Sequence, residues 1–382
     1  MFYKSGTGNS KLRSQHQRTV YRCIINHQPI SRTDITRYTK ISKPTVTRIT
    51  EEFLDAKLIV TSGYTETVLG RKPELLKVCE DALAAIGLYF TKTSAHVSLM
   101  NIKTTIMYRR KISHQHIQNL NDFYRFVDEL LIDAIAAANE QKTVVLGVGV
   151  AAPGNVNCKK GTIESFFGTE ELIPIVDHIE KRFKMASYVD NNANVSALAE
   201  WYCGLAKDDY GLIYFIASSG IGAGIIDNNA LLRGKNNSAG EIGKSLVMLS
   251  NQTEQAESIA SIPVIVKKYS EISGKTIDES DLFELYSNYD EDLKKLVDQS
   301  TQVLYLLVYN LLCTVDVSPI IFSGKYFDYF PKEFIILKKK LKEKLHESSM
   351  NEVAVHLRKQ DETINFKGPG IIVFDNVLYQ KQ

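Results

Sequence analysis

The pattern of apolar and polar positions changes near Glu80. Before that residue, apolar positions recur at helical spacing in short runs, and Val46, Ile49 and Phe53 fall on one face of the last run. After it, near-continuous apolar stretches such as Val144 to Val150 alternate with amphipathic helical segments, which is typical of a buried sheet covered by helices. The chain of 382 residues is therefore predicted to contain a small helical module followed by a larger α/β body.

The helical module has the pattern of a winged helix-turn-helix. Ser31 followed by Asp34 predicts one helix start, and Ser42 followed by Pro44 predicts the next after a short turn. A strand from Leu58 and a glycine-containing basic turn would complete the wing. The outward positions hold cations and small hydroxyls, which suit contact with phosphates and base edges in a major groove. The predicted DNA-contacting residues are Ser31, Arg32, Lys43, Pro44, Thr45, Thr47, Arg48, Arg71 and Lys72. The alternative is a small basic helical domain that binds another protein.

The charge distribution favours a polyanionic partner for this module alone. Residues 1–77 hold 14 lysines and arginines against 6 acidic residues, whereas the rest of the chain holds 32 against 38, although the net charge is only +2. A basic module on a mildly acidic body predicts operator DNA as the partner of the first part.

Composition excludes several other classes of protein. The sequence has no apolar run of 18 residues and no signal-peptide pattern at its start, so a cytoplasmic protein without a membrane partner is expected. Its five cysteines are scattered without a C-x-x-C pair, which indicates reduced, isolated thiols.

Polar residues follow the apolar strands of the body. The strand ending at Val150 opens into Ala151 to Val156, and another short strand ends at Asp190 to Asn194. In open α/β sheets, ligands bind at such carboxyl ends. The stretch Ser218 to Lys244 adds three alternate glycines and places Glu241 between two further glycines. Glycines admit a ligand or a second backbone, so this stretch is a candidate binding segment or, alternatively, a glycine-rich hairpin with an exposed carboxylate.

Five motifs together resemble the repressor, open-reading-frame and kinase (ROK) family, in its repressor branch. They are SRTDITRYTKISKPTVTRI with GRKPELL, GVGVAAPGNV, VDNNANVSALAEW, SSGIGAGII with AGEIG, and AESIAS. The resemblance covers residues 15–375 and is to regulators of xylose and N-acetylglucosamine use. It implies an α/β fold in which a winged helix-turn-helix precedes a two-lobed, actin and ribonuclease H-like body of the sugar-kinase type. The implied domains are the DNA-binding domain (1–77), a first lobe (78–190) to which 368–382 return, and a second lobe for sugar binding and dimerisation (191–367).

The residues depart from the kinase pattern of that family. Family kinases carry an Asp-x-Gly-x-Thr phosphate loop where this chain has Gly87 to Thr93, without a carboxylate for Mg²⁺. Asn192 stands where these kinases have their catalytic Asp, and an amide cannot accept the proton of a sugar hydroxyl. The chain is therefore expected not to be an enzyme and not to use ATP or Mg²⁺.

The zinc-binding pattern of the family is also missing. Lys244 replaces the usual histidine, and Ser245 to Ala256 contain no cysteine. A charged lysine has no lone pair for a metal, so zinc is predicted to be absent.

The sugar-binding set of the family remains. The resemblance implies Gly154, Asn155, Asn191, Asn192, Glu241 and Glu257 as sugar-binding residues in the cleft between the lobes. Lys244 is a further candidate, because it would lie beside Glu241 and Glu257. Three roles are open for Lys244: it replaces the charge of zinc, it contacts an anionic sugar, or it is merely solvated.

The sequence thus predicts a sugar-responsive transcriptional repressor that binds DNA as a homodimer or a dimer of dimers. The alternatives are a sugar kinase with a regulatory role and an effector-less regulator controlled by a protein partner.

Overall fold

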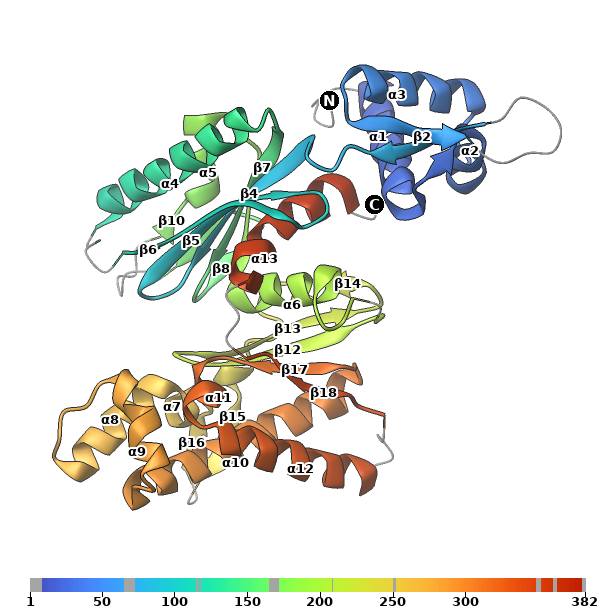
Figure 1. Ribbon diagram of the computed structural model, residues 1–382. Helices are drawn as coiled ribbons and strands as arrows, with labels where there is room; N and C mark the ends of the chain where they lie inside the picture. The colour runs from blue at the N-terminus through green and yellow to red at the C-terminus, as the bar shows by residue number, and fades with distance from the viewer. Residues whose placement is uncertain are drawn as a thin grey trace. The chain divides into compact units, whose positions relative to one another are not determined.

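The computed structural model describes residues 9–64, 73–114, 117, 119–164, 172–207, 209–249, 252–347, 352–359 and 363–379. The chain divides into two compact units, between which it crosses several times (Figure 1). Unit 1 consists of Met1–Val150, Val176–Tyr188 and Pro369–Gln382, and unit 2 consists of Ala151–Ile175 and Val189–Gly368. The predicted first lobe, 78–190, therefore differs from unit 1 in that Ala151–Ile175 belong to unit 2.

Unit 1 begins with three helices and a three-stranded antiparallel sheet. In chain order these are α1 (Asn9–His27), β1 (Ile30–Ser31), α2 (Arg32–Thr39), α3 (Lys43–Asp55), β2 (Ile59–Tyr64) and β3 (Glu74–Val78). The strands lie in the order β1-β3-β2, with Ile30 opposite Leu76 and Ile59 opposite Val78. Three helices followed by a hairpin are the arrangement of a winged helix-turn-helix.

Helices α2 and α3 begin where local sequence signals predict, but only α2 has a side-chain cap. The Ser31 hydroxyl accepts a hydrogen bond from the Asp34 N–H (3.1 Å) and donates to the Asp34 carboxylate (2.7 Å), so α2 starts as predicted. Helix α3 starts after Ser42 with Pro44 in its first turn, but Ser42 does not cap it; the Ser42 hydroxyl instead lies 2.9 Å from that of Thr45. The buried face of α3 consists of Val46, Ile49, Thr50 and Phe53.

A five-stranded sheet forms the body of unit 1, in the order β11-β7-β4-β5-β6. Its strands are β4 (Leu83–Phe90), β5 (Ser94–Asn101), β6 (Ile106–Ser113), β7 (Val144–Ala152) and β11 (Ser187–Asn191). The sequence from Ala95 to Met107 has the pattern of a single strand, but the structure divides it between β5 and β6. The chain turns back at Asn101, whose side-chain oxygen accepts hydrogen bonds from the N–H groups of Lys103 (3.0 Å) and Thr105 (2.9 Å).

Helices α4 (Leu120–Glu140), α5 (Ile175–Phe183) and α13 (Thr363–Phe374) accompany this sheet (Figure 1). Helix α13 contains Gly368, Pro369 and Gly370, and a proline inside a helix removes a backbone hydrogen bond. It packs closely because Gly149 on β7 has no side chain; a Cβ there would collide with the carbonyl oxygen of Pro369. The chain continues as a π-helical turn, η3 (Asp375–Tyr379), which contacts α1.

Unit 2 is built on a second five-stranded sheet, in the order β14-β13-β12-β17-β18. Its strands are β12 (Leu212–Ala217), β13 (Ile221–Asp227), β14 (Ala230–Leu231), β17 (Ile320–Ser323) and β18 (Val355–Leu357). The first three strands are antiparallel, β17 pairs parallel with β12, and β18 pairs parallel with β17. Both large sheets therefore place their first strand in the centre, their second and third strands on one side, and their fourth and fifth on the other.

Helices lie on both faces of the second sheet (Figure 1). Helix α6 (Asn192–Cys203) packs on β12 and β13. The other face is covered by α7 (Glu257–Ala260), α8 (Ile262–Ser273), α9 (Leu282–Ser287), α10 (Glu291–Val315), α11 (Lys325–Tyr329) and α12 (Pro331–Glu347). A continuous apolar cluster, which includes the fully buried Phe215, Phe322 and Phe330, joins these helices to the sheet.

The remaining elements of unit 2 are short. They are β8 (Val156–Asn157), β9 (Thr162–Glu164), β10 (Leu172–Ile173), η1 (Ile242–Lys244), β15 (Leu246–Leu249), β16 (Gln252–Gln255) and η2 (Glu279–Asp281). None of the helices in the described ranges combines the length and the apolar composition needed to cross a membrane.

Candidate functional site

Helix α3 presents a polar, basic face away from the core of the helix-turn-helix. Lys43, Pro44 and Arg48 are exposed, and Thr45 and Thr47 are half-buried. The opposite face is fixed by burial of its apolar residues, so these five predicted DNA-contacting residues are held on the outside by the helical period. Cations and hydroxyls at the start of a helix suit phosphate oxygens and base edges.

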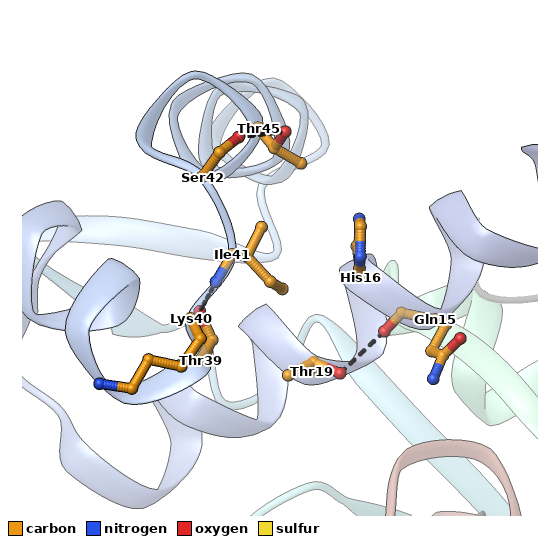
Figure 2. A pocket seen from close by; sticks show the side chains of 8 residues that line it. All are labelled: Gln15, His16, Thr19, Thr39, Lys40, Ile41, Ser42 and Thr45. Carbon is orange, nitrogen blue, oxygen red and sulfur yellow. Dashed lines mark hydrogen bonds between the residues drawn. The ribbon is translucent and has the colours of Figure 1, made fainter.

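A polar hollow of about 440 Å³ lies beside the start of α3 (Figure 2). Gln15, His16 and Thr19 line it from α1, and Thr39, Lys40, Ile41, Ser42 and Thr45 line it from the turn and from α3. Polar side chains from three segments thus line a hollow next to the basic face of α3. The Thr19 and Thr39 hydroxyls donate to the carbonyls of Gln15 and Ile35 within their own helices. The residues of α1 were missed in the sequence, because the helical pattern of α1 indicated only a scaffold.

Ser31 and Arg32 use their polar groups inside the domain. Ser31 is 3% exposed and caps α2. Arg32 donates to the Thr50 hydroxyl (2.9 Å) and to the Glu74 carboxylate (2.6 Å), which ties α2 to α3 and β3. These contacts favour a structural role for both residues, and their contact with DNA stays a prediction. Arg71 and Lys72 lie outside the described residues.

The seven residues of the candidate effector site all belong to unit 2 and come from four segments. These are the loop after β7 (Gly154, Asn155), the start of α6 (Asn191, Asn192), the segment around η1 (Glu241, Lys244) and the start of α7 (Glu257). Contacts along β13 hold three of these segments together, and Lys244 joins the fourth.

Gly224 on β13 admits protein backbone. A Cβ on Gly224 would collide with the carbonyl oxygen of Ala193, so the missing side chain lets the first turn of α6 lie on the strand. The Ala223 N–H donates to the Gly240 carbonyl at 2.8 Å, and the Ile221 N–H donates to the Glu257 carboxylate at 2.8 Å. Three of the four site segments are therefore fixed on one strand.

Asp190 fixes the start of α6 through its buried carboxylate. It is 3% exposed, and its carboxylate accepts hydrogen bonds from the Asn191 N–H (2.9 Å), the Asn194 amide (2.8 Å) and the Arg233 guanidinium (2.9 Å). The Asn191 side chain caps α6 by accepting from the Asn194 N–H at 2.8 Å, and Asn192 is the half-buried first residue of the helix. Arg233 was missed in the sequence because no local motif surrounds it.

Cys158 lies near this network, on the β8–β9 segment. Its thiol donates to the Asn237 side-chain oxygen at 3.1 Å. Burial raises the pKa of the Cys158 thiol, and the nearby Asp190 carboxylate raises that pKa further, so the thiol stays protonated and unreactive at neutral pH. This fits the expectation of an isolated, reduced cysteine.

Lys244 connects the fourth segment to the rest. Its ammonium nitrogen lies 2.9 Å from the Glu241 carboxylate and 3.0 Å from the side-chain oxygen of Asn155. Asn155 is exposed on the loop after β7, and Gly154 before it has a left-handed φ of 81°. The contact joins the β7 loop to the η1 segment.

The segment where family kinases bind phosphate is a tight hairpin in this chain. The Thr91 hydroxyl accepts hydrogen bonds from the N–H groups of Thr93 (3.2 Å) and Ser94 (2.9 Å), and the Thr91 N–H donates to the Ser94 carbonyl (2.8 Å). Backbone donors that would cradle a phosphate are therefore already used. These residues do not fit ATP and Mg²⁺.

The residues around η1 do not fit zinc. Lys244 is paired with a carboxylate, and β15 and β16 form a hairpin with Leu246 opposite Gln255 where the family has its cysteine ligands. Across the described part of the chain, no three His, Cys, Asp or Glu side chains are grouped so that they could hold a metal ion.

Comparison with known proteins gives a family and a fold. Residues 85–365 match the profile of the ROK family. Over 242 residues the chain is 28% identical to the xylose repressor of Caldicellulosiruptor bescii, an alignment that covers 63% of this chain and 61% of that repressor. The chain thus aligns with about three fifths of that relative's length.

Two solved structures resemble the present one. A ROK family transcriptional regulator, described as a homologue of the E. coli MLC protein, has a TM-score of 0.78 at 18% identity, over 96% of this chain and 97% of that chain. The ROK hexokinase of Thermus thermophilus has a TM-score of 0.65 at 17% identity, over 77% of this chain and 99% of that chain. These likenesses concern the fold and confirm the predicted fold class.

Proposed function

Because the chain belongs to the ROK family, we propose that it is a sugar-responsive transcriptional repressor that binds operator DNA through α3 and a carbohydrate at the candidate effector site. The relative from Caldicellulosiruptor bescii is named a xylose repressor, and the fold of a ROK family transcriptional regulator covers 96% of this chain.

The exposed face of α3 is the observation that carries the proposal. Lys43, Pro44, Thr45, Thr47 and Arg48 would contact the major groove, and the hollow beside them would take a backbone phosphate. Arg71 and Lys72 would act at the wing, near the minor groove. The chain would bind as a homodimer or a dimer of dimers, because one helix-turn-helix reads only a half-site. Such a protein acts in the cytoplasm.

The effector would be held by amides and carboxylates that match vicinal hydroxyls. Asn191, Asn192, Glu241 and Glu257 carry amide and carboxylate groups, which can donate to and accept from sugar hydroxyls, and Gly154 and Asn155 would lie at the rim. A sugar that binds one arrangement of the dimer more tightly would change the spacing of its two α3 helices. A coupling free energy of about 1–3 kcal/mol would change operator affinity roughly 5- to 150-fold.

We further propose that the chain has no kinase activity and needs neither ATP, Mg²⁺ nor zinc. The hairpin at Thr91, which lies where family kinases bind phosphate, is closed by its own hydrogen bonds. The Asn192 amide has no basic oxygen that could accept a proton. The shared fold of the Thermus thermophilus hexokinase keeps a sugar kinase as the second candidate. A coupled ATP assay with a panel of sugars is expected to show no turnover, and phosphorylation of any sugar would overturn this part.

Operator binding is tested by selecting duplexes from a random-sequence library and measuring fluorescence anisotropy at several salt concentrations. The full chain is expected to enrich a two-half-site sequence, and one or more sugars should shift its affinity. Arg48→Ala should weaken DNA binding. It should also reduce the slope of the logarithm of the binding constant against the logarithm of the salt concentration by about one. Lys267→Met, which removes a charge that is 77% exposed on α8, is the control and should change neither.

Three outcomes would contradict the proposal. A chain that enriches no sequence, or an Arg48→Ala variant with full affinity, would remove the DNA-binding role of α3. Calorimetry that detects no heat with any sugar, although DNA binding is intact, would favour a regulator controlled by a protein partner.

A further inference from the structure

We propose that Lys244 is a positioning residue that joins the two sides of the candidate effector site and restricts the site to uncharged sugars. The inference rests on the sugar-binding role proposed above and specifies the class of sugar. It assigns Lys244 one role among the three that the sequence left open.

The geometry of Lys244 is that of a bridge. One of its three ammonium donors points to Glu241 at 2.9 Å and another to Asn155 at 3.0 Å. Asn155 lies on the loop after β7 and Glu241 before η1, so the Lys244 side chain bridges two segments that are far apart in sequence. The third donor remains for a sugar hydroxyl.

The charge of Lys244 is already matched. Glu241 balances Lys244 and Asp190 balances Arg233, while the Glu257 carboxylate is held by a backbone N–H that carries no formal charge. A phosphate or carboxylate on the effector would therefore meet an uncompensated negative charge. The hydroxyl groups of an uncharged sugar can donate to the Glu241 and Glu257 carboxylates and accept from the third donor of Lys244. An uncharged sugar therefore suits these groups.

The lysines of the neighbouring turn are exposed to solvent. Lys159 and Lys160 lie in the turn between β8 and β9, and both are exposed. Solvent and salt screen such charges over distances beyond about 10 Å. The Lys244 ammonium holds the Asn155 side-chain oxygen and the Glu241 carboxylate at hydrogen-bond distance. It thereby bridges two ligand groups, as a metal ion would.

The test is calorimetric titration of the full chain with D-xylose, D-glucose, N-acetyl-D-glucosamine and the 6-phosphates of the two hexoses. At least one uncharged sugar should bind, and each phosphate should bind at least tenfold more weakly than its parent sugar. Lys244→Met should weaken the uncharged sugar roughly 10- to 100-fold, the range for losing hydrogen bonds to a charged group. Lys244→Arg should restore much of the affinity, because it keeps the charge and the donors.

Three measurements separate this role from general damage. Lys244 is 54% exposed, so the melting temperature and operator affinity of Lys244→Met should remain those of the natural chain. Lys267→Met should bind sugar normally. A chelator such as EDTA should leave sugar affinity unchanged.

The results that overturn the inference differ from those that overturn the proposed function. Tighter binding of a 6-phosphate, unchanged affinity in Lys244→Met, or loss of affinity with EDTA would each refute the role of Lys244 while leaving a sugar effector in place. The absence of binding by every sugar in the natural chain would refute the sugar effector itself.

Discussion

Asp190 shows how much of the candidate effector site depends on a single buried carboxylate. Its two oxygens accept three hydrogen bonds, from Asn191, Asn194 and Arg233, and its side chain is 5% exposed. The Arg233 side chain is 30% exposed, so the pair lies at the edge of the interior. Because the Asp190 partners include the cap of α6, the orientation of Asn191 and Asn192 depends on this ion pair.

Replacing Asp190 by Asn should therefore damage both folding and sugar binding. The change leaves the Arg233 guanidinium without its carboxylate, and breaking such a pair costs on the order of 3 kcal/mol. Urea denaturation of Asp190→Asn, Arg233→Met and the double variant measures the coupling. The double variant should lose clearly less than the sum of the single losses. Additive losses would show that the pair contributes nothing as a unit.

Residue-level signals in the sequence were strong where they were local. Ser31 with Asp34 and Pro44 after Ser42 predict helix starts that the structure confirms, because each acts on backbone within one turn. The partnership of Asp190 and Arg233 joins positions far apart in the chain, and no spacing rule connects them. Lys244 was noticed as a replacement for a histidine, but its contact with Asn155 depends on folding of the whole unit.

At the scale of elements, the packing of α6 on β13 positions the site. Gly222 and Gly224 are both on β13, yet their surroundings differ. A Cβ at Gly222 would meet its nearest atom at 3.8 Å, an ordinary contact, whereas a Cβ at Gly224 would lie 2.6 Å from the Ala197 Cβ and would also collide with the Ala193 carbonyl.

Gly224→Ala should thus push α6 away from the strand, and Gly222→Ala should not. Overpacking of this kind lowers the free energy of unfolding by about 1–3 kcal/mol, and sugar affinity should fall with it because Asn191 and Asn192 move. Denaturant titration and calorimetry of the two variants provide the comparison. Equal behaviour of both variants would mean that the α6–β13 contact does not position the site.

The elements that sequence patterns failed to predict have identifiable causes. In the turn between β5 and β6, Asn101 is followed by Ile102, Lys103 and Thr104, which are not typical turn formers. The sequence from Ala95 to Met107 therefore has the pattern of one strand. Helix α13 carries Gly368-Pro369-Gly370, which indicates a turn in isolation. Tertiary packing against β7 overrides that local preference.

At the scale of the whole molecule, the helix-turn-helix module, from α1 to β3, is not isolated from the rest of unit 1. The turn η3 follows α13 and contacts α1, and Val377 and Leu378 in η3 are 1% and 3% exposed. The turn η3 thus brings two buried apolar side chains next to α1, the first helix of the module.

Leu378→Ala should therefore weaken operator binding although it lies far from α3 in sequence. Truncating a buried leucine costs about 2–5 kcal/mol, and here that loss should loosen the support of α1. Anisotropy with operator DNA measures the effect, and sugar titration should show unchanged affinity because the effector site lies in unit 2. Ile335→Ala, at a position 67% exposed on α12, is the control. Full operator affinity in Leu378→Ala would show that the η3 contact is dispensable.

The contact between α1 and η3 also has a consequence for biosynthesis. Translation proceeds from α1 toward η3, so the ribosome completes the helix-turn-helix and both large sheets before η3 exists. During that interval the face of α1 that η3 will contact has no partner, and domains near the start of a chain begin to fold while synthesis continues. The nascent chain therefore passes through a stage in which its helix-turn-helix module is present but not yet in contact with η3. That contact can form only when translation has passed α13.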